Sequence, residues 1–275
     1  DSKAPEPFIG NPDAAGDGPA ELNDPRSVST DAKGNIYVCD FGNNRIAAFD
    51  PEGKPLGATK VERPRMACVH SSGTMYVLTQ PPAGRGRNRW GSCAVIKFGE
   101  AVGGREVARL TMTGYKPVMV LDPSSEKPRL WLANSVKYRA PRTLTPIDDR
   151  GATLAAGEDV LGDKGGKGFN SPLFVSADPK NYRLYVGDHS RKVLKVDLSG
   201  GAGRISPFLT ASEAVVDADG NVYALMGYNT NALERFNADG KKMPFPGSGS
   251  NKISVTYRAG LPHVGVRGLT VAPSG

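Results

Sequence analysis

Residues 24–57 read DPRSVSTDAKGNIYVCDFGNNRIAAFDPEGKPLG, and their pattern decides the fold. A proline opens an alternating run that ends at Asp31, and a turn with Gly34 leads into an apolar strand that ends at Asp40. An asparagine-rich turn and a third apolar strand, which ends at Phe49 and Asp50, follow. Short apolar strands separated by Gly, Asn and Asp turns predict antiparallel β-structure.

The same pattern recurs along the chain. The copies are RPRMACVHSSGTMYVLT (63–79), KPVMVLDPSSEKPRLWLAN (116–134), SPLFVSADPKNYRLYVGD (171–188) and ASEAVVDADGNVYALM (211–226). One equivalent position holds Tyr37, Tyr76, Trp131, Tyr185 and Tyr223, and another holds Phe49, Phe98, Ile147, Val196 and Phe236. A repeat of about 40 residues with three or four short strands is typical of a β-propeller blade, because one small sheet buries both faces only by stacking on its neighbours.

Three of these segments resemble the NHL repeat family. They are PRSVSTDAKGNIYVCDFGNNRIAAFD and, more weakly, SPLFVSADPKNYRLYVGDHSRKVLKVD and EAVVDADGNVYALMGYNTNALERFNADG. The resemblance implies an all-β, six-bladed β-propeller of four-stranded antiparallel blades, from a bacterial NHL repeat-containing protein. A β-sandwich is the alternative that the strand pattern leaves open.

The predicted domain is a single propeller over residues 1–275. Its expected blades are 24–62, 63–114, 115–169, 170–209 and 210–259. Residues 260–275 resemble the start of a further blade, closed by residues 1–10, and this last blade would be incomplete in the chain.

Composition limits the class of protein. The 275 residues include 34 Gly and 22 Pro, which suits a turn-rich β-protein, and the net charge is +7. No apolar stretch approaches the roughly 20 residues that span a bilayer, so no membrane insertion is expected. Three cysteines without a CxxC spacing predict buried thiols rather than a disulfide framework or a zinc site. Residues 8–25 resemble the segment between blades of bacterial NHL proteins, which favours an exported protein, periplasmic or extracellular. Because the last expected blade is incomplete, we expect the chain to be part of a larger protein.

Two loop insertions fall on one predicted face. Because blade strands alternate in direction, the loop between strands two and three lies on the same face as the start of strand one. QPPAGRGRNRWGS (80–92) is an insertion of ten residues in this loop, since Tyr76 to Phe98 spans 22 positions against 12 from Tyr37 to Phe49. The next blade carries a smaller insertion, SVKYRAPRT (135–143).

These loops and the starts of the first strands predict a basic face, with acidic residues gathered on the opposite one. The expected ligand-binding residues are Arg26, Arg65, Arg85, Arg87, Arg89, Trp90, Tyr138 and Arg139. Arginine pairs with carboxylates and phosphates, and a basic face attracts anions. We therefore expect a binding or scaffolding module without a cofactor. Its expected partner is another protein or an anionic ligand such as an acidic glycan, with RNA less favoured.

The alternative is a metal-dependent propeller enzyme with a site in the central funnel. Amidating lyases, which resemble NHL propellers, carry zinc-binding histidines where inner strands begin, and none of the corresponding positions here is a histidine. Lactonase-like propellers hold calcium through carboxylate and amide oxygens. The residues that would serve zinc or calcium here are Asp40, Asn134, Asp188, His189 and His263. Asp40 and Asp188 have a structural interpretation as well, in which each tethers the turn that follows it.

Overall fold

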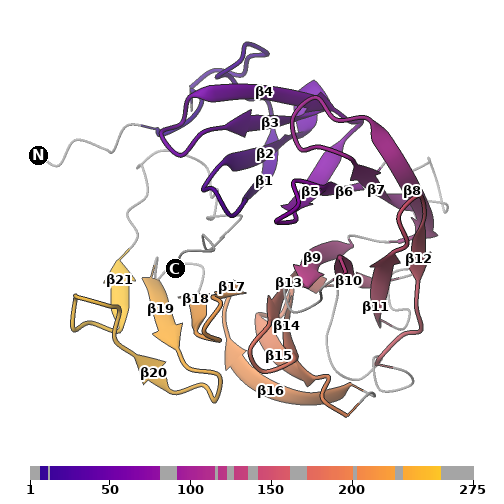
Figure 1. Cartoon of the computed structure of the whole chain (residues 1–275). Coiled ribbons are helices and arrows are strands. Elements are labelled where there is room, and N and C mark those ends of the chain that lie inside the picture. Colours follow the sequence, from indigo (N-terminus) through magenta and orange to yellow (C-terminus); the bar gives the residue numbers. More distant parts are fainter. Residues whose placement is uncertain are drawn as a thin grey trace, which may run out of the picture.

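The described residues form antiparallel sheets, each built from one predicted repeat. A computed structural model describes residues 7–11, 13–80, 92–114, 117–122, 127–135, 142–161, 172–200, 203–226 and 232–254. Figure 1 shows five sheets following one another around a ring, with β1, β5, β9, β13 and β17 innermost. This arrangement confirms an all-β chain of four-stranded antiparallel blades.

The strand bounds follow the repeats. Blade 1 contains β1 (Pro25–Thr30), β2 (Ile36–Asp40), β3 (Arg45–Phe49) and β4 (Pro55–Lys60), with the short 3-10 helix η1 (Phe41–Asn43) between β2 and β3. Blade 2 contains β5 (Pro64–Val69), β6 (Met75–Thr79), β7 (Ser92–Phe98) and β8 (Glu106–Thr113). Blade 3 contains β9 (Val118–Asp122), β10 (Arg129–Ser135), β11 (Arg142–Asp149) and β12 (Leu154–Ala156).

The remaining two blades repeat the plan. Blade 4 contains β13 (Pro172–Asp178), β14 (Arg183–Asp188), β15 (Lys192–Asp197) and β16 (Arg204–Thr210). Blade 5 contains β17 (Glu213–Val216), β18 (Val222–Met226), β19 (Ala232–Phe236), β20 (Lys242–Met243) and β21 (Lys252–Ser254). The outer position beside β19 is shared, because β20 pairs with its end and β21 with its start. In the described part of the chain, no helix is long and apolar enough to cross a membrane.

Strand register confirms the two equivalent positions read from the repeats. In every blade, the residue before the predicted aromatic pairs with the predicted apolar residue of the third strand. The pairs are Ile36 with Phe49, Met75 with Phe98, Leu130 with Ile147, Leu184 with Val196, and Val222 with Phe236. The insertion predicted at residues 80–92 indeed falls between β6 and β7, with its last residue, Ser92, at the start of β7.

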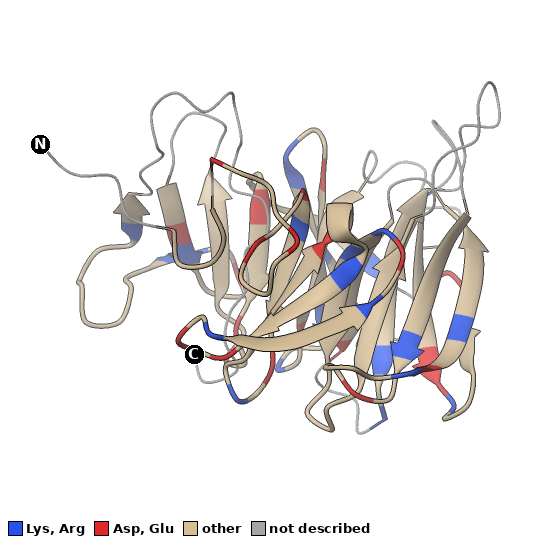
Figure 2. Cartoon of the chain, turned by 90° about the horizontal axis from the view of Figure 1, so that it is seen from above, with Lys and Arg blue, Asp and Glu red and all other residues tan. Residues whose placement is uncertain are grey.

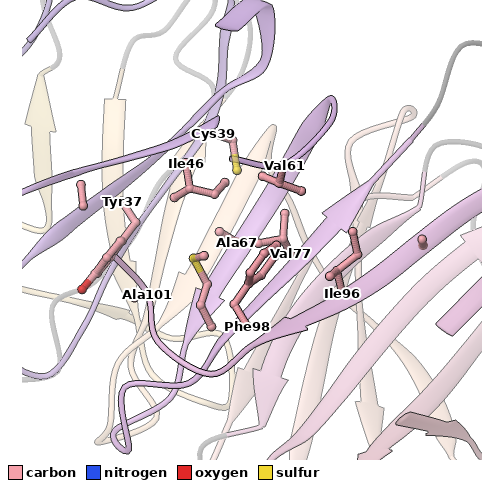
Figure 3. Close-up of a cluster of buried hydrophobic side chains, with 12 residues drawn as sticks. Tyr37, Cys39, Ile46, Val61, Ala67, Val77, Ile96, Phe98 and Ala101 are labelled. Atoms are coloured by element: carbon pink, nitrogen blue, oxygen red, sulfur yellow. The ribbon is translucent and has the colours of Figure 1, made fainter. Parts of the chain in front are cut away.

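Apolar side chains of neighbouring blades meet in separate cores. Successive strand residues point to opposite faces, so Tyr37 and Cys39 of β2 pack toward blade 2 while Val38 faces the other way. Figure 3 shows the first of these cores, in which Ile46 of blade 1 lies with Val77 and Phe98 of blade 2. Burying such a side chain stabilises the fold by about 2 kcal/mol, so stacking supplies what a single sheet lacks.

Aspartates hold the turns between first and second strands. Asp31 accepts the Tyr37 hydroxyl at 2.9 Å and the Asn35 side-chain amide at 2.8 Å, and its Oδ1 accepts backbone N–H groups of the turn. In blade 5 the same contacts recur, with Asp217, Asn221 and Tyr223 in these positions. Burial and the neighbouring Asp31 carboxylate raise the pKa of Tyr37 to about 12. These two aspartates therefore serve as turn anchors.

Blade 2 lacks this aspartate and is joined to blade 3 instead. His70 stands where Asp31 stands in blade 1, and Tyr76 donates its hydroxyl to Asp149 of β11 at 2.5 Å. Lys97 of β7 donates to the same carboxylate at 3.0 Å and to the Gly151 carbonyl at 2.8 Å. We call Tyr76, Lys97 and Asp149 the blade 2–3 cluster. It links two sheets through one largely buried carboxylate.

The described residues form five blades, whereas six were predicted. Figure 1 leaves a sector between blade 5 and blade 1 in which the described residues place no strand. Residues 260–275 and 1–6, which the sequence assigns to a further blade, lie outside the described residues. Residues 7–10 form no strand, and Ile9 packs against blade 1 with Leu22. The further blade stays a prediction.

Candidate functional site

The strand register defines which loops share a face. Pro25 pairs with Asp40, Pro64 with Thr79 and Pro172 with Asp188, so each first strand begins where the second strand ends. We call this end of the blades the upper face: the starts of the five innermost strands and the loops that follow the second strands. Arg26 and Arg65 come directly after Pro25 and Pro64, and β1 packs beside β5. Both predicted residues therefore lie at the upper face.

Asp40, at the upper end of β2, is fully occupied by protein contacts. Its buried carboxylate accepts the Asn23 N–H at 2.7 Å, the Arg45 Nε–H at 2.7 Å and the Asn43 side-chain amide at 2.8 Å. A buried carboxylate is tolerated only with such partners. The structural interpretation of Asp40 accounts for all of these contacts.

Arg45 extends the Asp40 contacts to the segment that leads into β1. Its guanidinium donates to the carbonyls of Asp17, Gly18 and Glu21 at 2.9, 2.9 and 2.8 Å. Because one side chain joins Asp40 to three carbonyls, Arg45 fixes both this leading segment and the loop between β2 and β3. We call Asp40 and Arg45 the blade 1 anchor.

The loop held by this anchor presents Phe41 between two arginines. The guanidinium carbons of Arg26 and Arg63 lie 4.8 and 4.6 Å from the centroid of the Phe41 ring, within cation–π range. Arg26 also forms an ion pair with Asp24. Asn44 connects the two segments, since its carbonyl accepts the Val61 N–H at 3.0 Å and its side-chain oxygen accepts the Arg63 N–H at 2.9 Å.

Arg65 acts electrostatically on the Cys39 thiol. Burial raises the pKa of Cys39 to about 12, and the positive charge of Arg65 opposes that rise. Burial also raises the pKa values of Cys68 and Cys93 to about 11. The three thiols are free, with Cys39 and Cys93 buried and Cys68 partly exposed. The expectation of buried thiols is confirmed for two of the three.

The residues of the metal alternative are engaged or separated in the described chain. Asn134 Oδ1 accepts the Ser135 N–H at 2.7 Å, and Asp188 Oδ1 accepts the N–H groups of Ser190 and Lys192 at 2.8 and 3.1 Å. His189 is exposed. Within the ranges that the structure describes, no three His, Cys, Asp or Glu side chains gather as a metal-binding group. Asp40 and Asp188 thus act as turn tethers here.

Several predicted site residues lie outside the described residues: Arg85, Arg87, Arg89, Trp90, Tyr138, Arg139 and His263. Their placement stays a prediction. The structure does place the strands that flank the two predicted insertions. Thr79 and Ser92 flank the first loop, and Ser135 and Arg142 flank the second. Glu62 and Arg109 line a shallow hollow of about 130 Å³ beside Thr79 and Ser92. This volume is below the few hundred Å³ of a usual small-molecule pocket.

Charges of both signs occur throughout the described ribbon. Figure 2, a side view, shows Lys and Arg interspersed with Asp and Glu along the strands and loops. Part of the acidic charge is internally balanced, as in the ion pairs of Asp40 with Arg45 and of Asp149 with Lys97. Arg63 forms no ion pair with a described acid, so its charge is left uncompensated within its own contacts.

A ring of stacked four-stranded antiparallel sheets, each with its first strand innermost, defines a β-propeller. Solved propellers share the fold at low identity. Virginiamycin B lyase from Staphylococcus aureus is 14% identical with a TM-score of 0.51, over 82% of this chain and 72% of that one. The calcium-binding protein regucalcin from Agrobacterium tumefaciens is 12% identical with a TM-score of 0.52, over 85% and 75%. A protein of unknown function from Desulfotomaculum acetoxidans is 11% identical with a TM-score of 0.57, over 80% and 68%.

Residues 22–49 match the NHL repeat model, which confirms the predicted NHL repeat in blade 1. NHL repeat-containing protein 3 of Homo sapiens is 50% identical over 44 residues, and the Mus musculus protein matches equally. That match covers 16% of this chain and only 13% of each relative's length. This likeness therefore establishes an NHL repeat in blade 1.

The repeat pattern places Arg45 and Arg63 among the basic residues of this face, but neither of them, nor Phe41, was among the expected ligand-binding residues. The position of Arg63 before Pro64, matching Asp24 before Pro25, is a signal that the repeat alignment contains. The approach of Arg26 and Arg63 to one ring depends on how blade 1 meets blade 2. A repeat pattern within single blades does not carry that information.

Proposed function

We propose that the chain is a binding or scaffolding module whose upper face contacts a partner, within a larger exported bacterial protein. The contact residues are Arg26, Arg65, Arg85, Arg87, Arg89, Trp90, Tyr138 and Arg139. The partner is another protein or an anionic ligand such as an acidic glycan, with RNA less favoured. The proposed domain plan keeps a further blade that residues 260–275 begin and that residues 1–6 close, since residues 7–10 form no strand.

One observation carries this proposal. The upper end of blade 1 is rigid, because Asp40 and Arg45 are bound to each other and to the segment that leads into β1. At this end of the blade, the positively charged guanidinium groups of Arg26 and Arg63 lie over the Phe41 ring. Loops on a rigid scaffold are where binding residues concentrate, and fixed positive charge favours anions.

The test compares anion binding by loop variants. Arg85, Arg87 and Arg89 are replaced together by Ser, and binding to heparin, alginate and single-stranded RNA is measured at two salt concentrations. We expect at least about tenfold weaker binding, because three charges near the ligand are lost. The matched control replaces Arg129, Arg204 and Lys242, each paired with a nearby acid, by Ser. Equal binding by both triple variants would contradict the proposal.

The enzyme alternative keeps its own test. A metal-dependent lyase or lactonase requires a bound ion, whereas Asp40, Asn134 and Asp188 are already engaged in protein contacts. The similarity to a solved lyase extends to the fold alone at 14% identity. Elemental analysis that finds one zinc or calcium per chain after dialysis would favour the alternative.

A further inference from the structure

The residues that precede β1 and β5 share an unusual backbone conformation. Asp24 and Arg63 each precede a proline with positive φ angles of 52° and 47°. Such angles are uncommon for residues other than glycine, and the conformation persists only where neighbouring contacts enforce it. At Arg63 the enforcing contact is the Asn44 side chain, itself on a residue with φ of 54°. Two strained residues thus set the position of one arginine.

The starts of these two strands differ in charge. In DPR (24–26), the acid at the strained position forms an ion pair with the arginine two residues on. In RPR (63–65), the strained position is itself an arginine. Blade 2 therefore adds a cation where blade 1 has an acid, and Arg63 lies against the same ring as Arg26.

Arg63 has unused hydrogen-bonding capacity. Its buried Nε–H has no acceptor among the described residues, and the side chain makes no ion pair with a described acid. The Nε–H itself is out of reach of a ligand, so the capacity that a ligand oxygen can use lies in the terminal N–H groups of the guanidinium, which donate to no described residue. Because Arg63 is only half-buried, part of its side chain remains accessible from solvent.

The contacts of Arg26 and Arg63 with the Phe41 ring favour a carboxylate ligand over a nucleobase or a sugar ring. Arginine stacked on an aromatic ring keeps its planar N–H fork for bidentate binding of a carboxylate. Bases bind single-strand proteins by stacking on open aromatic faces. Phe41 is half-buried and already contacts two guanidinium groups, so little of its face is left for stacking.

We propose that Arg63, with Arg26 beside it on Phe41, binds a carboxylate of an acidic peptide segment from a partner protein. This inference rests on the proposed binding function and narrows its partner. Arg63 supplies the guanidinium, and the Asn44 side-chain oxygen fixes the Arg63 backbone by accepting its N–H. Arg26, partly balanced by Asp24, adds a second positive charge near the bound carboxylate.

The test uses a rhodamine-labelled oligoglutamate peptide, with oligoglutamine as the uncharged probe, in fluorescence anisotropy titrations. Arg63→Asn removes the fork, and asparagine tolerates the left-handed backbone better than most residues. We expect a dissociation constant at least about tenfold higher, since bonds of this charged type account for roughly 10- to 100-fold in affinity. Phe41→Leu should weaken binding a few-fold, because both guanidinium groups lose their platform. Arg204→Asn, on outer strand β16 of blade 4 and paired with Asp197, should leave the affinity unchanged.

Three results would overturn the inference in distinguishable ways. If Arg63→Asn binds oligoglutamate as wild type does while the triple Ser variant of Arg85, Arg87 and Arg89 does not, the Arg63 site is wrong and the binding function stands. If Arg63→Asn loses heparin or RNA affinity and oligoglutamate never binds, the peptide assignment is wrong. If wild type binds none of these anions, the inference and the proposed function both fail. Should Arg63→Asn not fold by circular dichroism, Arg26→Gln and Phe41→Leu decide the matter by the same titration.

Discussion

Replacing Asp40 by Asn tests whether the blade 1 anchor is structural or a metal ligand. The substitution keeps the shape of the side chain and removes its charge. One oxygen remains, which suffices for the Asn23 N–H. The new amide nitrogen then faces the Arg45 Nε–H and the Asn43 amide, and these three groups are all donors.

The expected loss follows from those contacts. The bond to Arg45 is charge-assisted and contributes about 1.5–3 kcal/mol, and the bond to Asn43 contributes about 1 kcal/mol. Breaking one side of a buried ion pair usually costs about 3–5 kcal/mol. Arg45 keeps its three carbonyl acceptors and its side chain is 15% exposed, so the loss of unfolding free energy should lie at the lower end of this range. We expect Asp40→Asn to lower the free energy of unfolding by about 3 kcal/mol.

Urea unfolding followed by far-UV circular dichroism and by tryptophan fluorescence measures this loss. The chain supplies a matched control in Asp50→Asn. Asp50 Oδ1 accepts the N–H groups of Glu52 and Lys54 at 3.1 and 2.7 Å. Asn237 already makes the equivalent pair of contacts in blade 5, at 3.1 and 2.8 Å. The Asp50 variant should therefore lose less than about 0.5 kcal/mol, because an amide oxygen serves this turn.

A second experiment repeats the urea unfolding of both proteins in millimolar calcium. A ligand that binds the native state raises its stability, so a calcium site at Asp40 would stabilise wild type and leave the Asp40→Asn variant unaffected. We expect no calcium-dependent difference between the two. Equal stability of the Asp40 and Asp50 variants, or a calcium effect that disappears with Asp40, would refute the structural role of the anchor.

Three further outcomes follow from the contacts. Burial opposes ionisation of Asp149, but hydrogen bonds within the blade 2–3 cluster outweigh it and lower its pKa. The ionised Asp149 carboxylate therefore stabilises the folded state above the unfolded pKa near 4, and this stabilisation is lost as the pH falls through the lowered pKa of the folded state. The urea midpoint of Asp149→Asn should accordingly vary less than that of wild type between about pH 6 and 3. Gly187→Ala places a methyl group directly against the Phe174 ring and should cost about 1–3 kcal/mol in thermal melts. Gly200→Ala, with nothing within 4 Å, should be nearly neutral. The three cysteine thiols, whose pKa values burial raises to about 11 or 12, should react with Ellman's reagent far more slowly in the native protein than in urea.

Much of the fold was predictable from local sequence. The Tyr and Phe positions of each repeat predicted the strand pairing, as in Ile36 with Phe49, because residues of one blade are close in sequence. The insertion after Thr79 was likewise located by spacing. The number of blades was not predictable from local sequence, because it depends on how segments far apart in the chain meet where the ring closes.

The candidate site was predictable only in part. Alternation of strand direction placed Arg26 and Arg65 on the upper face, and the register agrees. The sequence left two interpretations of Asp40 open. The structure decides between them through Arg45, whose contacts with Gly18 and Glu21 join segments far apart in the chain.

The sequence by itself determined the repeat, the strands and the face to which each loop belongs, because these depend on period-two alternation and on turn residues within one blade. The tertiary structure alone decided which charged side chains are engaged by other protein groups and which can contact a ligand. Tyr76 donates to Asp149 because blade 2 lacks its own aspartate, and Arg63 meets Phe41 because blade 2 begins beside the loop of blade 1. Hydrogen bonds and cation–π contacts act over a few ångströms in space, so their partners are fixed by the stacking of blades.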